Sequence, residues 1–270
     1  MSGRHHQLTR RDLLPPLLAL LALTVIAWGY VVWLASTMSM PSGPMPMMPG
    51  MEMAGSMPPT PAIASWTWVR FAFIFAMWTV MMIGMMTPSV TPMVLLHAQV
   101  MRRTATADQR VAPPGWFAAG YLGAWTLFAA VASLAQWQLE RLALLTPMMQ
   151  SASRPFSAAV LIAAGVYQWL PAKDACLVQC RSPLSFIQRH GGFQSSARGS
   201  LRLGFVHGLY CVGCCWALMA VLFAVGVMNL LWIAGLMIIV LLEKLLPRGP
   251  LLSRLAGCAL AAYGLWMLQR

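Results

Sequence analysis

Charged side chains are scarce in this sequence. Of the 270 residues, only 9% are Asp, Glu, Lys or Arg and six are acidic, whereas 59% are hydrophobic. A soluble globular domain carries about 25% charged residues, so this composition excludes that class and indicates a membrane protein. We therefore predict an all-α fold, a polytopic transmembrane helix bundle whose first partner is the lipid bilayer.

Apolar runs divide the chain into about seven spans, since about 20 apolar residues cross a bilayer as a helix. The predicted spans cover residues 13–35, 66–88, 116–137, 155–171, 203–228, 230–245 and 251–268. With these spans, fourteen of the 18 lysines and arginines lie on the side of the N-terminus and four on the other. This positive-inside bias predicts a cytoplasmic N-terminus. The net charge of +12 is thus explained by topology, and no nucleic-acid partner is expected.

The chain divides into three predicted parts. Residues 1–35 form an N-terminal membrane anchor, residues 36–65 a methionine-rich extracytoplasmic loop, and residues 66–270 a metal-binding transmembrane bundle. The segment Thr9-Arg-Arg-Asp-Leu-Leu14 resembles the start of a secretory or twin-arginine signal. The apolar run that follows reaches Ala35 and is longer than a signal core, so we expect an uncleaved anchor.

The loop 36–65 contains no lysine or arginine and is rich in methionine, proline and glycine. The prolines and glycines exclude a packed helix, so these methionines are not core residues. Thioethers bind Cu(I) and Ag(I) and do not deprotonate, so we predict soft-metal ligands here. The alternative is compositional drift in a disordered linker. The methionines are Met38, Met40, Met45, Met47, Met48, Met51, Met53 and Met57.

The second span continues the methionine pattern. Methionines at helical spacing form two ladders, one of Met77, Met81 and Met85 and one of Met82 and Met86. Ligation of a soft metal and ordinary core packing both fit this pattern. Pro88 and Pro92 are expected to kink or end the helix, because proline removes a backbone hydrogen bond.

Residues 203–228 carry the chemistry around which the chain is organised. On a helix, His207, Cys211 and Cys214 fall within about 60° of one another, with Cys215 at the flank. Side chains at i and i+4 are about 5–6 Å apart at Cβ, close enough to hold one ion. Thiolate and imidazole suit Cu(I) or Zn(II), and a polar cluster within the bilayer is a functional hypothesis by default. The alternative is small buried cysteines and a histidine bonded to a neighbouring helix.

Two further cysteines, Cys176 and Cys180, lie in the longest predicted cytoplasmic loop. The cytosol keeps thiols reduced, so a metal or redox role is favoured over a structural disulfide. The flanking Lys173 and Arg181 are expected to favour the thiolate form. We expect His190 at the surface and Cys258 in the core of the last span. We also expect the charges of Glu243 and Lys244 to neutralise one another at the cytoplasmic interface.

Several of these motifs together resemble a bacterial family of predicted metal-binding integral membrane proteins. The motifs are Met81-Met-Ile-Gly-Met-Met-Thr-Pro-Ser89, Tyr167-Gln168, Lys173-Asp-Ala-Cys-Leu-Val-Gln-Cys-Arg-Ser-Pro183, Gly208-Leu-Tyr-Cys-Val-Gly-Cys-Cys-Trp-Ala-Leu-Met219, Gly226-Val-Met-Asn229 and Glu243-Lys244. The resemblance covers about residues 66–268. Members of that family are described as copper chaperones that help load copper enzymes such as tyrosinase, so the resemblance implies a copper chaperone.

The expected function is therefore capture of copper as Cu(I) and its delivery, rather than catalysis. The expected partners are a copper-dependent enzyme or a periplasmic copper carrier. One alternative is a membrane thiol-disulfide oxidoreductase with Cys211 and Cys214 as the reactive pair and Cys176 and Cys180 as its partner, although no quinone or haem motif is present. A second alternative is a scaffold subunit whose methionines only fill space. The sequence has no nucleotide-binding motif, which argues against active pumping.

Overall fold

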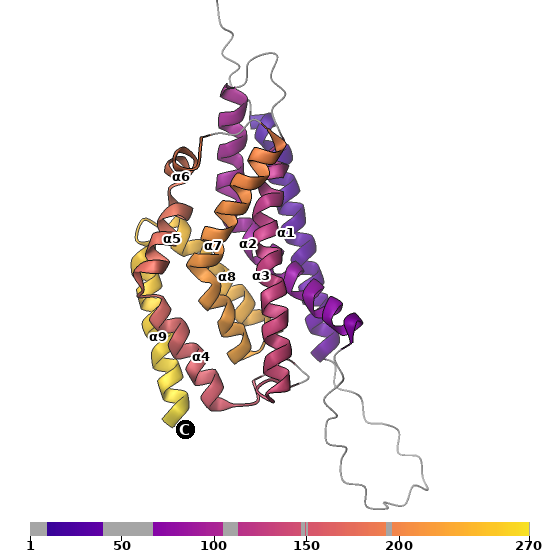
Figure 1. The fold of residues 1–270 in the computed structure, drawn as a ribbon, viewed down its shortest axis with the longest axis vertical. Helices are drawn as coiled ribbons and strands as arrows, with labels where there is room; N and C mark the ends of the chain where they lie inside the picture. The colour runs from indigo at the N-terminus through magenta and orange to yellow at the C-terminus, as the bar shows by residue number, and fades with distance from the viewer. Residues whose placement is uncertain are drawn as a thin grey trace, which may run out of the picture.

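The computed structural model describes residues 10–39, 67–104, 113–146, 149, 151–192 and 196–269, and its regular elements there are all α-helices (Figure 1). The all-α prediction is confirmed. The helices are α1 (Arg10–Ser39), α2 (Trp68–Thr104), α3 (Gly115–Arg141), α4 (Arg154–Tyr167), α5 (Pro171–Arg181), α6 (Pro183–Arg189), α7 (Ala197–Val225), α8 (Leu230–Leu245) and α9 (Gly249–Gln269).

Five of these helices, α1, α2, α3, α7 and α9, are long and apolar enough to cross a membrane. The fourth predicted span is a broken one in the structure, since α4 and α5 together pass the same test but meet at an angle of 63°. The sixth predicted span corresponds to α8, whose 16 residues fall short of the length that usually crosses a bilayer. The membrane character is thus supported by five or six spans, and the count of seven remains a prediction.

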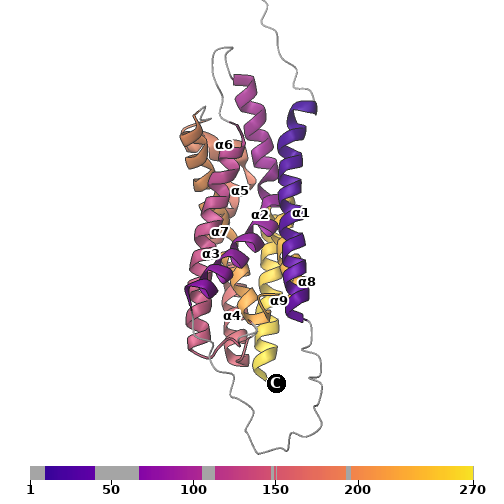
Figure 2. The ribbon, with the colours of Figure 1, turned by 90° about the vertical axis from the view of Figure 1, so that its right-hand side faces the viewer.

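The second span extends further than predicted. Helix α2 does not end at Pro88 but continues through Pro88 and Pro92 to Thr104, changing direction along its length (Figure 2). Hydroxyl groups near the prolines donate to backbone carbonyls: Thr87 to Ile83 at 2.6 Å and Thr91 to Thr87 at 2.9 Å. Such side-chain bonds allow a membrane helix to contain proline without unravelling.

Helix α7 lies within the bundle and packs against α3, α4, α5 and α8 (Figure 1). Of its most apolar stretch, 61% is buried, the largest share among the five candidate spans. Its closest neighbour is α3, because Gly120 and Gly204 let the two backbones touch. A Cβ at Gly204 would overlap the Phe117 carbonyl, and a Cβ at Gly120 the Leu201 carbonyl. Glycine at such crossings is typical of helix packing in membranes.

Candidate metal centre

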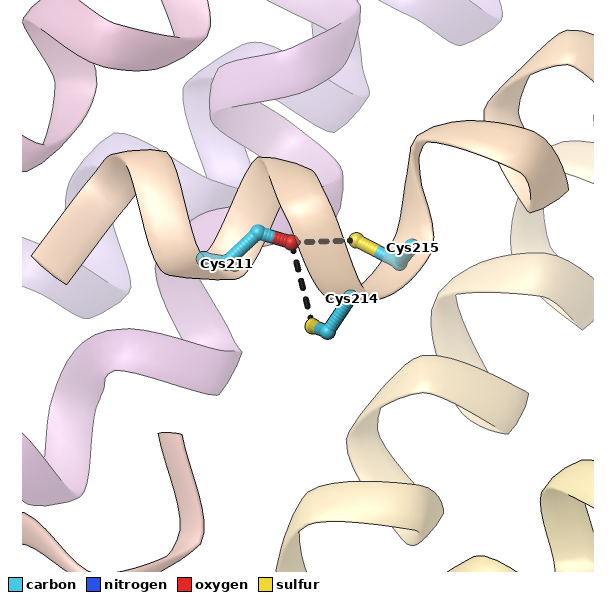
Figure 3. A group of neighbouring side chains, drawn as sticks. All are labelled: Cys211, Cys214 and Cys215. Carbon is cyan, nitrogen blue, oxygen red and sulfur yellow. Dashed lines mark hydrogen bonds between the residues drawn. The ribbon is translucent and has the colours of Figure 1, made fainter. Parts of the chain in front are cut away.

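Three thiols of α7 meet in the interior of the bundle. Cys211, Cys214 and Cys215 are each at most 1% exposed, and their sulfur atoms all lie within 4.8 Å of one another. The thiols of Cys214 and Cys215 both donate to the Cys211 carbonyl at 3.1 Å (Figure 3). Spacings of three and four residues bring these side chains to one side of the helix. The cluster supplies three soft donors, a number that can hold one metal ion.

Polar groups from two other helices contact the Cys211 sulfur. Lys244 of α8 donates to it at 2.8 Å, and the Tyr121 hydroxyl of α3 lies 3.0 Å away. Both groups also contact the Ser89 hydroxyl of α2, at 3.0 Å and 3.2 Å respectively. Three helices therefore meet at this sulfur atom, and α2 contributes a hydroxyl to its two partners. An ammonium in a medium of low dielectric strongly stabilises negative charge beside it, so this environment suits a thiolate.

The prediction that Glu243 and Lys244 neutralise one another at the interface is wrong. Glu243 instead pairs with Lys173 of α5, whose ammonium lies 3.0 Å and 2.8 Å from the two carboxylate oxygens. Lys173 also donates to the Gln168 side chain, and the pair is fully buried, at 0% and 1% side-chain exposure. Consecutive residues on a helix point about 100° apart, so Glu243 and Lys244 reach different neighbours.

The expected cations beside Cys176 and Cys180 also lie elsewhere. Lys173 forms an ion pair with Glu243. The Arg181 guanidinium donates to the carbonyls of Leu246 and Pro247 at 2.8 Å and 2.7 Å. These contacts fasten α5 to α8 and to the turn that follows it. The cation of the site is consequently Lys244, which no local sequence pattern connects with the cysteines.

Helix α5 brings two more thiols to the cluster. The Cys180 thiol interacts with those of Cys211 and Cys214. The Cys176 thiol lies over Gly213 of α7, where an added Cβ would be only 2.8 Å from its sulfur. The sequence analysis assigned Cys176 and Cys180 to a separate loop, whereas in the structure they lie on α5, beside the α7 cysteines. We call Cys176, Cys180, Cys211, Cys214 and Cys215 together the thiol site.

His207 lies one turn before Cys211 but is not part of the group of mutually close ligand atoms. It is 3% exposed and packs among the rings of Phe117, Tyr121 and Phe186, whose centroids are 5.9, 5.9 and 4.9 Å from its own. Its Nδ1 atom is buried without a hydrogen-bond partner. A role for His207 as a metal ligand therefore stays a prediction.

The methionines of α2 are core residues by burial. Met81, Met82, Met85 and Met86 are each at most 1% exposed. The carbonyl of Met86 accepts a hydrogen bond from Tyr121 at 3.3 Å, so this turn of α2 lies beside the hydroxyl that contacts Cys211. Burial fits both packing and ligation, and their ligand role stays a prediction.

Nearly all of the methionine-rich segment lies outside the described residues. Met38 lies in the last turn of α1 with its side chain outside the described residues, and Met40, Met45, Met47, Met48, Met51, Met53 and Met57 all fall outside them. One other expectation changes, since Cys258 is exposed on α9 rather than buried. His190 is half-buried, and its ring stacks on that of Phe186 at 4.4 Å between centroids.

Sequence analysis assigned no role at the centre to Tyr121, Ser89 or Lys244. Ser89 and Lys244 lie in two of the motifs that carry the family resemblance, but their contacts at the cysteines were not expected. Tyr121 lies in the third predicted span, for which no functional residue was proposed. Its signal was a polar side chain within a long apolar run, because such groups are costly in a bilayer unless they have a partner.

A protein-family model described as PpoB2, a copper chaperone, matches residues 75–267. The chain belongs to this copper chaperone family. The matched segment contains all five cysteines of the thiol site, and the resemblance seen in the motifs is confirmed. No curated protein and no solved structure matches the chain.

The geometry suits the cargo of a copper chaperone. Thiolates are soft ligands that select Cu(I) and Zn(II) over Mg(II) or Ca(II). No aspartate or glutamate belongs to the group of close ligand atoms that the described residues form. The family and the cysteine cluster together indicate a protein able to bind a metal, with copper as the expected ion.

Proposed function

We propose that this protein is a membrane-embedded copper chaperone that holds Cu(I) at the thiol site and delivers it to a copper enzyme or a periplasmic copper carrier. The observation that carries this proposal is the trio of sulfur atoms within 4.8 Å of one another on a buried face of α7. The family match over residues 75–267 supports copper as the cargo. The role is binding and delivery rather than catalysis.

Charge balance supports Lys244 as part of the site. Three thiolates around one Cu(I) carry a net charge of about −2, which is unfavourable in a medium of low dielectric unless a cation lies close by. Lys244 lies 2.8 Å from Cys211 and reduces that charge by one. The ammonium therefore compensates the loaded state without itself ligating the metal, since it has no lone pair when protonated.

The two helices of the thiol site suggest how copper is passed on. Cu(I) moves between soft ligands by exchanging one thiolate for another, so it need never be released as a bare ion. Cys180 contacts both Cys211 and Cys214, and Cys176 lies one turn away on the same helix. We infer that α7 supplies the tight trio and that α5 supplies the exchanging ligands.

Membrane topology is part of the same proposal. The distribution of lysine and arginine favours a cytoplasmic N-terminus and an extracytoplasmic loop at residues 36–65, in a bacterial inner membrane. In this arrangement the methionine-rich loop meets copper outside the cell membrane, and its labile thioethers add capture rather than tight retention.

The test is to purify the full chain under reducing conditions and measure bound copper together with titratable thiols. Copper bound to reduced protein, with sulfur neighbours in its X-ray absorption spectrum, is the expected result. Cys211→Ser and Cys214→Ser should each lose that copper, whereas Cys258→Ser serves as the matched control. A metal-free protein whose Cys180 cycles through a disulfide with Cys211 or Cys214 would overturn the proposal in favour of the oxidoreductase.

A further inference from the structure

A cavity of about 560 Å³ lies where α7 ends, well away from the thiol site. Its walls come from the end of α1, the start of α4, the α7–α8 turn and the last turn of α9. In Figure 1 this is the end of the bundle where the C-terminus lies. The cavity is distinct from the centre described above, because no cysteine or histidine lines it.

Three methionines line this cavity: Met149, Met228 and Met267. Four other cavities formed by the described residues have no methionine in their walls. The backbone brings two of the three together, since the Met149 carbonyl accepts a hydrogen bond from Val227 at 3.2 Å and Met228 follows directly. Met267 lines the same cavity from α9, so three separate segments each contribute one methionine.

The backbone of Met149 is held in an unusual conformation. Its φ is 58°, in the left-handed region that residues with a Cβ rarely adopt, and its side chain is only 5% exposed. Such a conformation persists only where surrounding contacts enforce it, and strained residues of this kind concentrate at functional sites. The fold therefore fixes the backbone of one methionine in the wall of this cavity.

The lining also decides which ligands the cavity suits. It contains no aspartate or glutamate, and the one charged residue in its wall is Arg154. Hard cations such as Mg(II) and Ca(II) prefer carboxylate oxygens, whereas the side-chain oxygens offered here are the neutral ones of Ser151, Ser153, Ser157 and Asn229. Thioethers instead select soft monovalent ions, for which sulfur polarisability matters more than charge. The chemistry points to Cu(I) and its redox-inert analogue Ag(I).

Helix α7 connects the cavity with the thiol site. Cys211, Cys215 and Met219 follow one another at intervals of four residues, and all three are fully buried. At 1.5 Å per residue, Met219 lies about 6 Å beyond Cys215 and about 9 Å before the end of the helix at Val225. Along the helix axis, Met219 thus lies between the cavity and the nearest cysteine.

We propose that Met149, Met228 and Met267 form a second soft-metal site, a thioether vestibule that binds Cu(I) weakly and supplies the thiol site through Met219. The identity of the cargo rests on the proposed function, but the existence of the vestibule does not require the thiol site. Because a thioether has no proton to lose, metal binding at the vestibule is independent of pH, whereas binding at thiols competes with protons.

The vestibule is tested in a full-length variant in which all six cysteines are serine, labelled with ¹³C at the methionine methyl groups and titrated with Ag(I) at acidic pH. The methyl resonances of Met149, Met228 and Met267 should shift together along one binding curve, while that of Met237 on α8 stays in place. Replacing any one of the three with leucine should weaken the shift of the other two. Independent curves, or no shift, would overturn the proposal whatever the thiol site does.

A second measurement addresses the supply of copper. In the chain with its cysteines, the triple variant Met149→Leu, Met228→Leu and Met267→Leu should load Cu(I) several-fold more slowly and still reach the normal amount at saturation. The control Met237→Leu should load at the normal rate. A normal loading rate in the triple variant would overturn the supply role. If the unmodified chain itself binds no copper, the proposed function is overturned instead.

Discussion

The ammonium of Lys244 lies 2.8 Å from the sulfur of Cys211, although 33 positions separate the two residues in the chain. This contact joins the end of α8 to the middle of α7. It gives the most direct way to perturb the centre without removing a sulfur.

Replacing Lys244 with leucine should weaken copper retention by about 10- to 100-fold, equivalent to about 1.4–2.8 kcal/mol. The reason is that the loaded site then carries one more uncompensated negative charge. Competition with a Cu(I) chelator measures the change. Lys244→Arg keeps the charge and should retain most of the affinity. Equal retention by wild type and Lys244→Leu would refute the role in charge balance.

Gly213→Ala should separate α5 from α7. The new Cβ would stand 2.8 Å from the Cys176 sulfur, and overpacking of this kind costs about 1–3 kcal/mol. We expect a lower unfolding temperature in detergent and faster loss of copper to a chelator. Gly235→Ala is the matched control. Apart from its own stretch of α8, nothing lies within 4 Å of a Cβ at that position. Similar behaviour of the two variants would show that the contact is unimportant.

Breaking the buried pair of Lys173 and Glu243 should be strongly destabilising. Lys173→Met or Glu243→Gln alone leaves an uncompensated group in the interior, which costs about 3–5 kcal/mol. The double variant Lys173→Met with Glu243→Leu should recover much of that loss, as measured by unfolding in detergent. The exposed pair of Arg254 and Asp174, at 3.7 Å, is the comparison and should contribute at most about 1 kcal/mol. A double variant as unstable as the single ones would contradict this account.

Copper retention should rise with pH when only the thiol site is measured. Each bound thiolate replaces a proton, so acid competes with the metal, and retention should fall steadily as the pH is lowered. Chelator competition across a pH series, on protein lacking the loop methionines Met38 to Met57, checks the slope. Cys258→Ser, which lies outside the thiol site, should show the same slope. A flat profile in the unaltered thiol site would argue for thioether ligation instead.

Topology can be tested at α6, where Gln188 is exposed. In a variant otherwise free of cysteine, Gln188→Cys should resist an impermeant thiol reagent in intact cells and react after lysis. A cysteine introduced in the loop 36–65 should react without lysis. Labelling at position 188 in intact cells would reverse the predicted orientation.

The sequence predicted the parts of the fold that depend on local pattern. The apolar runs identified α1, α3, α7 and α9 as candidate spans, and the three- and four-residue spacing identified the α7 thiols. The length of α2 was underestimated because proline normally ends a helix, and the hydroxyls of Thr87 and Thr91 that bond to carbonyls there could be judged only in three dimensions.

The partners of Cys211 could not be predicted for a different reason. Tyr121 is 90 positions from Cys211 in the chain, and Ser89 lies further still from the α8 ammonium that it contacts. Such contacts depend on how whole helices cross, which periodicity within one helix does not specify. The reassignment of Cys176 and Cys180 to the thiol site has the same origin, since it follows from the 63° bend between α4 and α5.

The backbone contact between α3 and α7 has a mechanical consequence. With Gly120 and Gly204 pressed against the opposite chain, neither helix can slide or turn past the other without a collision. The α7 trio and Tyr121 are therefore held at a fixed spacing. Helix α5 meets α7 through the Cys176 sulfur at Gly213, and α4 meets it through the Tyr167 hydroxyl, which donates to the Gly213 carbonyl at 2.5 Å. Under the proposed function, release of copper therefore requires α4 and α5 to move, rather than α3 against α7.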